Sequence, residues 1–129
     1  MNIIFLIITA ILLATSACSS GQPAPVSLSA ADDGKTIELK KGQTLQIALD
    51  GNPTTGYSWI PLAMEPALVE QVGEADYKPD SSLVGSPGML TLKFKATSTG
   101  KGVLHLDYKR SWEKGVQPLK SFEVNLVVD

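Results

Sequence analysis

The residue types that carry most enzyme chemistry are scarce in this chain. Among its 129 residues there is one histidine, His105, and one cysteine, Cys18. A metal site would need further histidine or cysteine ligands close to His105, and the sequence around it has none. Serine and aspartate are plentiful, but no serine has the glycine-flanked pattern of a nucleophile elbow. The sequence therefore predicts no catalytic residue, no metal and no cofactor, and we expect a protein that is not an enzyme.

One stretch has the composition of a rigid binding loop. This first loop is Asn52-Pro53-Thr54-Thr55-Gly56-Tyr57. None of its side chains titrates near neutral pH, so it is poorly suited to acid–base chemistry. Asn52 can hydrogen-bond the backbone two residues on, and Pro53 fixes its own φ. Gly56 can adopt a positive φ, and the two threonines are stiff at χ1. Because such a loop loses little entropy on docking, we expect it to be presented to a partner.

Two further segments have features of binding loops. The second loop is Leu83-Val84-Gly85-Ser86-Pro87-Gly88, which combines glycine permissiveness with a proline restraint, although it could be a plain hairpin connection; its predicted binding residues are Gly85–Gly88. The third loop begins with Arg110-Ser111-Trp112, where a strand runs into a turn. Trp112 lies among charged residues and is expected to be exposed; the alternative is that it folds back over the edge of the core. Exposed tryptophan and arginine are frequent at binding hot spots.

The elements that would position these loops are short strands separated by turn residues. Alternating apolar and polar residues predict strands near residues 36–40, 44–49, 57–60, 67–72, 74–78, 89–96, 103–110 and 122–128. No segment keeps a helical period. About seven or eight strands at this spacing predict an all-β, immunoglobulin-like sandwich, with an up-and-down barrel as the alternative. In a sandwich the three loops can converge at one end.

The same alternation predicts which side chains form the core. The residues expected to face inward on the long strands are Leu45, Ile47, Leu49, Leu90, Leu92, Phe94, Ala96, Leu104, Leu106, Tyr108, Phe122, Val124, Leu126 and Val128. Trp59 is expected to be the core tryptophan of the sandwich. Tyr57 is expected to close the base of the first loop with its hydroxyl. His105 falls on the opposite face from Leu104 and Leu106.

The N-terminus has the features of an export signal. Residues Ile3–Ala14 form an uncharged apolar run, shorter than the roughly 20 residues needed to span a membrane. The run ends in Thr15-Ser16-Ala17-Cys18, which resembles a bacterial lipobox, whose cysteine becomes the lipidated first residue. The alternative is ordinary signal cleavage after Ala17. We therefore predict a signal peptide at residues 1–17, a lipidated Cys18 with a flexible tether to residue 31, and one folded domain at 32–129.

The sequence also indicates where the protein is located and which partners it can have. The protein is expected to be exported and lipid-anchored in the bacterial envelope, at the outer membrane, or otherwise periplasmic or secreted. A net charge of −2, a pI near 5.3 and the lack of a basic patch argue against nucleic-acid binding. A single cysteine cannot form an intramolecular disulfide, so the domain must be stabilised by its core. We expect a monomer that contacts the membrane only through the lipid.

The three loops, in this order, resemble the pattern of the chagasin-like family of cysteine peptidase inhibitors. That pattern is an NPTTG loop, a GxG-type loop and an RPW-type loop, which here correspond to Asn52–Gly56, Gly85–Gly88 and Arg110–Trp112. The resemblance covers essentially the whole domain, from about residue 37 to residue 128. Two departures bear on affinity and target range: Pro87 makes the second loop one residue longer, and Ser111 stands where the pattern has proline.

The resemblance implies reversible inhibition of papain-like cysteine peptidases by an immunoglobulin-like domain. The first loop would enter the active-site cleft, with Thr54 and Thr55 nearest the catalytic cysteine and histidine. The second and third loops would grip either side, and Trp112 would supply aromatic contact area. The alternative is a non-inhibitory, immunoglobulin-like envelope lipoprotein that uses the same loops to bind a peptide, a glycan or a protein partner.

Overall fold

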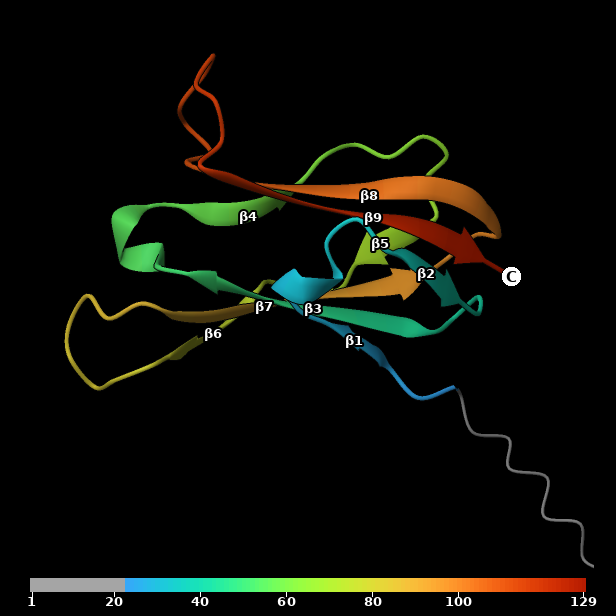
Figure 1. Ribbon diagram of the computed structural model, residues 1–129, viewed down its shortest axis with the longest axis horizontal. Helices are drawn as coiled ribbons and strands as arrows, with labels where there is room; N and C mark the ends of the chain where they lie inside the picture. The colour runs from blue at the N-terminus through green and yellow to red at the C-terminus, as the bar shows by residue number, and fades with distance from the viewer. Residues whose placement is uncertain (1–22) are drawn as a thin grey trace, which may run out of the picture.

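The computed structural model describes residues 23–129, which form nine β-strands and two short 3₁₀ turns (Figure 1). The strands are β1 Val26–Leu28, β2 Thr36–Leu39, β3 Thr44–Gly51, β4 Ser58–Pro61, β5 Val69–Gln71, β6 Asp76–Pro79, β7 Gly88–Ala96, β8 Gly100–Lys109 and β9 Lys120–Val128. The 3₁₀ turns are η1 Ala30–Asp32 and η2 Pro53–Thr55. No helix in this range is long and apolar enough to cross a membrane. The predicted signal peptide and Cys18 lie outside the described residues.

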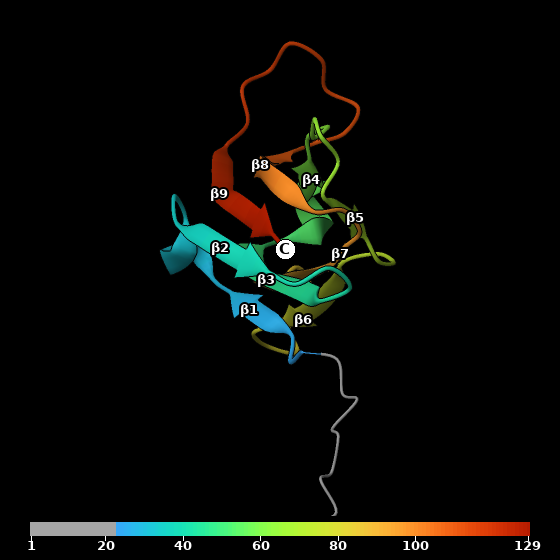
Figure 2. The same cartoon turned by 90° about the vertical axis from the view of Figure 1, so that its right-hand side faces the viewer.

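The strands form two sheets that pack face to face (Figure 2). One sheet has the order β1-β3-β7-β5, with β5 and β6 pairing with successive parts of β7. The other has the order β2-β9-β8-β4. β1 runs parallel to β3 and β2 parallel to β9, while the remaining pairs are antiparallel. Two separate sheets confirm the predicted sandwich over the barrel, with nine strands where seven or eight were expected.

The core lies between the sheets and follows the predicted alternation. On β3, Leu45, Ile47 and Leu49 are each at most 2% exposed, and the residues between them are more open. The inward residues predicted for β7, β8 and β9 are all buried as well. Trp59 is buried, and its indole N–H donates to the Asp50 carbonyl at 3.0 Å. Because full burial of a large apolar side chain contributes about 1.5–3 kcal/mol, this layer holds the two sheets together.

The folded region begins before residue 32, which corrects part of the predicted boundary. Val26–Leu28 was expected to belong to a flexible tether, but it pairs with β3 as strand β1. Leu28 is buried in the core, and the Gln43 side-chain amide donates to the Ala24 carbonyl at 2.8 Å. The apolar–polar–apolar order of this segment suits a strand, but three residues are too few to stand out among small and proline residues.

The three loops lie at one end of the sandwich, as predicted, on the left in Figure 1. The first loop joins β3 to β4, the second leads from β6 into the first residue of β7, and the third joins β8 to β9. Strand pairing brings their bases together: Gly51 pairs with Gly88, and Ser58 pairs with Lys109. The described chain begins at the opposite end, where Ala24 contacts the residue before β3. The loops therefore point away from the start of the domain.

Candidate functional site

The first loop is a closed turn held by its own polar groups. The Asn52 side-chain oxygen caps η2 by accepting hydrogen bonds from the Thr54 amide, at 3.2 Å, and from the Thr54 hydroxyl. The Asn52 carbonyl accepts bonds from the Thr55 amide at 3.2 Å and the Thr55 hydroxyl at 2.6 Å. Gly56 ends the turn at φ 81°, and its amide donates to the Pro53 carbonyl at 3.0 Å. The loop is therefore folded back on itself rather than extended.

Asn52 also joins the first loop to its surroundings. Its side-chain NH₂ donates to the Gly85 carbonyl of the second loop at 3.0 Å, and its main-chain amide donates to the Tyr108 hydroxyl oxygen at 2.9 Å. The Tyr108 ring is buried, with its centroid 5.4 Å from that of Tyr57 and 5.1 Å from that of Trp59. The prediction that the Tyr57 hydroxyl closes the loop base is therefore wrong. Tyr108 does so, because it points inward from β8 beneath the loop.

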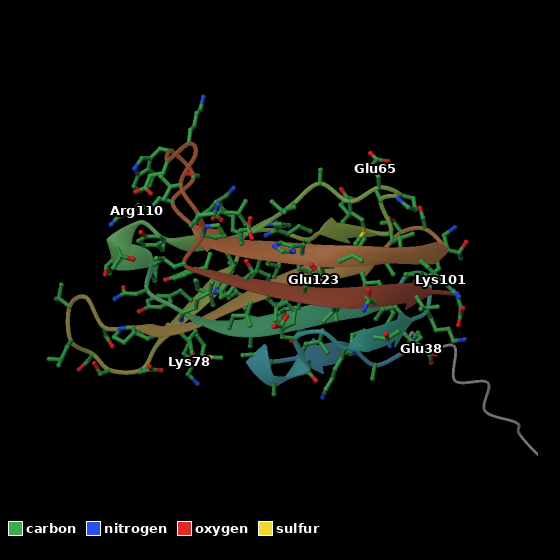
Figure 3. All side chains as sticks on the ribbon, turned by 45° about the horizontal axis from the view of Figure 1, so that its top comes forward. Glu38, Glu65, Lys78, Lys101, Arg110 and Glu123 are labelled. Atoms are coloured by element: carbon green, nitrogen blue, oxygen red, sulfur yellow. The ribbon has the colours of Figure 1, made fainter. Side chains whose placement is uncertain are left out.

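Arg110 ties the third loop to the first (Figure 3). Its Nε donates to the Thr55 carbonyl at 3.0 Å, and its guanidinium carbon lies 4.5 Å from the centre of the Tyr57 ring. Its Nη1 is 3.1 Å from a Glu113 carboxylate oxygen. A cation over an aromatic face contributes about 0.5–1 kcal/mol at an exposed site. Three different partners therefore orient one side chain at the junction of the two loops.

Trp112 is 65% exposed, which confirms the predicted exposure over the alternative of folding onto the core. Its indole nevertheless lies against the first loop. The ring is so close to Gly56 that a Cβ atom at this position would collide with it. Gly56 thus meets two requirements at once: it accepts a positive φ, and it leaves room for Trp112. The third loop therefore presents a large aromatic face directly beside the first loop.

The second loop is also internally bonded, and half of its predicted residues are buried. Ser86 is 9% exposed; its carbonyl accepts a bond from the Tyr77 hydroxyl, and its hydroxyl bonds with that of Ser81 at 3.1 Å. Gly88 is the buried first residue of β7, where a Cβ would meet the Lys78 carbonyl. Gly85 and Pro87 are exposed. Ser86 and Gly88 therefore shape this loop from inside rather than line its surface.

The exposed tip of this loop was not among the predicted site residues. Leu83 and Val84 are 76% and 105% exposed, and Val116 and Leu119 of the third loop are also largely exposed. Large apolar side chains held in water at a loop tip mark an interaction surface when they gather on one face. The signal in the sequence was an apolar pair between Ser81-Ser82 and Gly85-Ser86, in an otherwise polar turn. Both the second and the third loop therefore carry exposed apolar side chains.

His105 lies along the middle of the second sheet, on its outer face, where Figure 3 labels its partner Glu123. Its Nδ1 is 2.9 Å from Glu123 and its Nε2 is 2.7 Å from Asp107. The hydrogen bond with Glu123, and secondarily that with Asp107, raises the pKa of His105 above its ordinary value, against the opposing effect of burial. Both ring nitrogens are thus engaged by carboxylates. No group of three His, Cys, Asp or Glu side chains within residues 23–129 is placed to hold a metal ion.

This fold and this end surface define a β-sandwich binding protein that presents three mutually braced loops. Residues 38–126 match the family model described as chagasin family peptidase inhibitor I42. The chain belongs to this family, which confirms the resemblance found in its loops. Because the family consists of peptidase inhibitors, the membership also confirms that the chain is an inhibitor rather than an enzyme.

Individual relatives agree with the family match. The chain is 31% identical over 113 residues to amoebiasin-2 of Entamoeba histolytica, covering 86% of this chain and 91% of that protein. It is 28% identical over 103 residues to chagasin of Trypanosoma cruzi, covering 74% and 91%. The crystal structure of a cysteine protease inhibitor from Entamoeba histolytica has a TM-score of 0.70 at 28% identity, covering 82% and 96%. These matches confirm the immunoglobulin-like fold.

A more distant structure has the same fold. It is a protein solved in complex with falcipain-2, with a TM-score of 0.52 at 19% identity, and the likeness covers 83% of this chain and all of that one.

Replacing Tyr108 with Phe is expected to lower the free energy of unfolding by about 0.5–1.5 kcal/mol, the net contribution of one protein hydrogen bond. The Asn52 amide loses its partner, while the ring keeps its packing. Urea denaturation followed by tryptophan fluorescence measures the change. Tyr57→Phe is the matched control, since the Tyr57 hydroxyl makes no hydrogen bond within the described part of the chain, and it should leave stability unchanged. An equal loss in both variants would contradict the role given to Tyr108.

Proposed function

We propose that this protein is a monomeric, reversible inhibitor of papain-like cysteine peptidases that fills the active-site cleft with Asn52–Gly56. The observation that carries the proposal is the closed first loop, braced by Asn52 against the second loop and by Arg110 against the third. Family membership supplies the inhibitor class, and a related Entamoeba histolytica protein is a cysteine protease inhibitor. Thr54 and Thr55 are exposed at the tip of the turn, so they would lie nearest the catalytic cysteine and histidine.

A folded-back loop accounts for inhibition without cleavage. A papain-like site attacks a peptide carbonyl with a thiolate activated by histidine. In the first loop the carbonyls of Asn52, Pro53 and Thr55 already accept hydrogen bonds within the protein. The 3₁₀ turn between Asn52 and Gly56 also keeps the chain from lying extended along a cleft. The loop can therefore occupy the site without lying in the extended form in which a substrate presents its scissile carbonyl, which for the Thr54–Thr55 bond is that of Thr54.

The charge distribution also suits insertion into a cleft. The first loop carries no ionisable carboxylate or amine, so it can leave water without burying an unpaired charge. The nearest charge, on Arg110, is already paired with Glu113 and stacked on Tyr57. Leu83 and Val84 on one side and Trp112 on the other then provide apolar contact area around the polar turn. The proposed binding surface therefore has a rigid polar centre with apolar side chains on either side that can contact the peptidase.

Titration of papain with the purified protein lacking residues 1–18 is expected to give a dose-dependent and reversible block. Trp112→Ala should raise the inhibition constant at least about tenfold, because a largely exposed tryptophan beside the first loop is a typical hot-spot anchor. Val103→Ala is the matched control: Val103 is also an exposed apolar residue, but it lies on β8 away from the loops, so inhibition should be unchanged. Steady-state hydrolysis of a fluorogenic peptide measures both.

Two outcomes of this titration would contradict the proposal. Cleavage of the Thr54–Thr55 bond at the rate of an ordinary substrate would mean that the first loop lies extended in the active site. Absence of any block at micromolar protein would favour the alternative function, a non-inhibitory binding module that uses the same three loops.

We also propose that the protein is exported and anchored in the bacterial envelope by a lipid on Cys18. The support is the apolar run followed by Thr15-Ser16-Ala17-Cys18. The domain geometry is compatible with such an anchor, because the described chain begins at the end opposite the three loops. A tether attached there would leave the loops facing away from the membrane, where a peptidase can reach them.

Replacing Cys18 with Ser is expected to move the protein from the membrane fraction to the soluble periplasmic or secreted fraction. The serine hydroxyl cannot form the thioether that holds the lipid, whereas the apolar run that directs export is intact. Fractionation of expressing cells, followed by immunoblotting, measures the distribution. Ser20→Ala, close to the same site, serves as the control and should remain in the membrane fraction. Unchanged membrane association of the Cys18→Ser variant would contradict the lipid anchor.

A further inference from the structure

The third loop opens with a tight turn that contains no proline. The Glu113 amide donates to the Arg110 carbonyl at 3.2 Å, which closes a four-residue turn over Arg110–Glu113. Ser111 occupies the second position of this turn, the position at which proline is favoured because its φ is preset. The Ser111 amide donates no hydrogen bond to another protein group within residues 23–129. The turn therefore lacks a covalent restraint at the position that could carry one.

A side-chain contact closes the same turn. Glu113 Oε1 lies 3.1 Å from Arg110 Nη1, so the first and last residues of the turn are linked by an ion pair as well as by the main-chain bond. The pair is partly shielded, with 36% of the Arg110 side chain and 26% of the Glu113 side chain exposed. The same guanidinium donates through Nε to the Thr55 carbonyl. One guanidinium group thus connects the carboxylate of Glu113 to the first loop.

We propose that Glu113 is a positioning residue of the inhibitory surface: its carboxylate fastens the Arg110–Glu113 turn and holds Arg110 on the Thr55 carbonyl of the first loop. The ion pair restrains the turn electrostatically, whereas a proline at position 111 would restrain it covalently through its fixed φ. This inference rests on the proposed inhibitory function. It assigns Glu113 no contact with the peptidase, since Glu113 acts by keeping Arg110, Trp112 and the first loop in one arrangement.

Loss of the Arg110–Glu113 ion pair should have a moderate effect on inhibition. A partly exposed ion pair is screened by water and salt, so the domain should remain folded without it. Arg110 would keep its contacts with Thr55 and Tyr57, but with more freedom of the long side chain. Ordering such a side chain at the moment of binding weakens association, whereas ordering it beforehand strengthens it. The loss should therefore appear in the inhibition constant and not in the melting temperature.

A four-protein comparison tests this inference. The proteins are the wild type, Glu113→Gln, Ser111→Pro and the double variant, titrated against papain at low and at physiological salt. Glu113→Gln is expected to weaken inhibition about fivefold in the wild-type background, because Arg110 loses the charge that orders it before binding. In the Ser111→Pro background the same change should weaken inhibition by less than about twofold, since proline restrains the turn by another route. Glu70→Gln, an exposed carboxylate on β5, is the matched control for the loss of charge and should inhibit like the wild type.

Each outcome of the comparison decides a different point. If the wild type does not inhibit, the proposed function fails, whatever Glu113 does. If the wild type inhibits and Glu113→Gln inhibits equally well, the positioning role is wrong. If Glu113→Gln is weak and Ser111→Pro does not restore it, Glu113 contacts the peptidase directly and the proposal is also overturned. Thermal melting of all four proteins verifies that each is folded.

Discussion

The shape of the binding surface depends on the hydrogen bonds of Asn52. An asparagine side chain carries an acceptor and two donors, and here both kinds are used: the oxygen caps the turn at Thr54, and the NH₂ group binds the Gly85 carbonyl. The Asn52 main-chain amide is held by Tyr108. Aspartate could cap the turn but could not donate to Gly85, and a hydrophobic residue could do neither. One residue therefore fixes the conformation of the first loop and its position relative to the second.

The sandwich gives these contacts a rigid base. β3 carries Leu45, Ile47 and Leu49 into the core and ends at Gly51, directly before Asn52. β8 carries Leu104 and Leu106 into the same core and ends beside Arg110. Tyr108 belongs to both regions, because its ring packs in the core and its hydroxyl reaches the loop. The packed core therefore restrains the loops, which begin only a few residues beyond it. A loop restrained in this way loses little entropy when it binds.

Alternation in the sequence predicted the sandwich and the inward residues of four strands, and the residue types of the turns identified the three loops, because each is a local property of the chain. Three features were not predictable in this way. Strand β1 is too short to show a period, and β8 begins at Gly100 rather than at residue 103 as expected, with the Leu68 side chain beside Gly100 and Gly102. The braces of the site join residues 33 to 56 positions apart, so assigning the loop base to Tyr108 rather than Tyr57 required the fold.

We expect the first loop to have its binding shape before any partner arrives. Backbone ¹⁵N relaxation of the free protein tests this most directly, at the amides of Thr54, Thr55 and Gly56, which donate to Asn52 and Pro53. A loop held by these hydrogen bonds should have order parameters near those of β3, about 0.85 for a rigid backbone. Values below about 0.6 at these amides would show that the loop is flexible and becomes ordered only on binding, and the braced first loop would then be wrong.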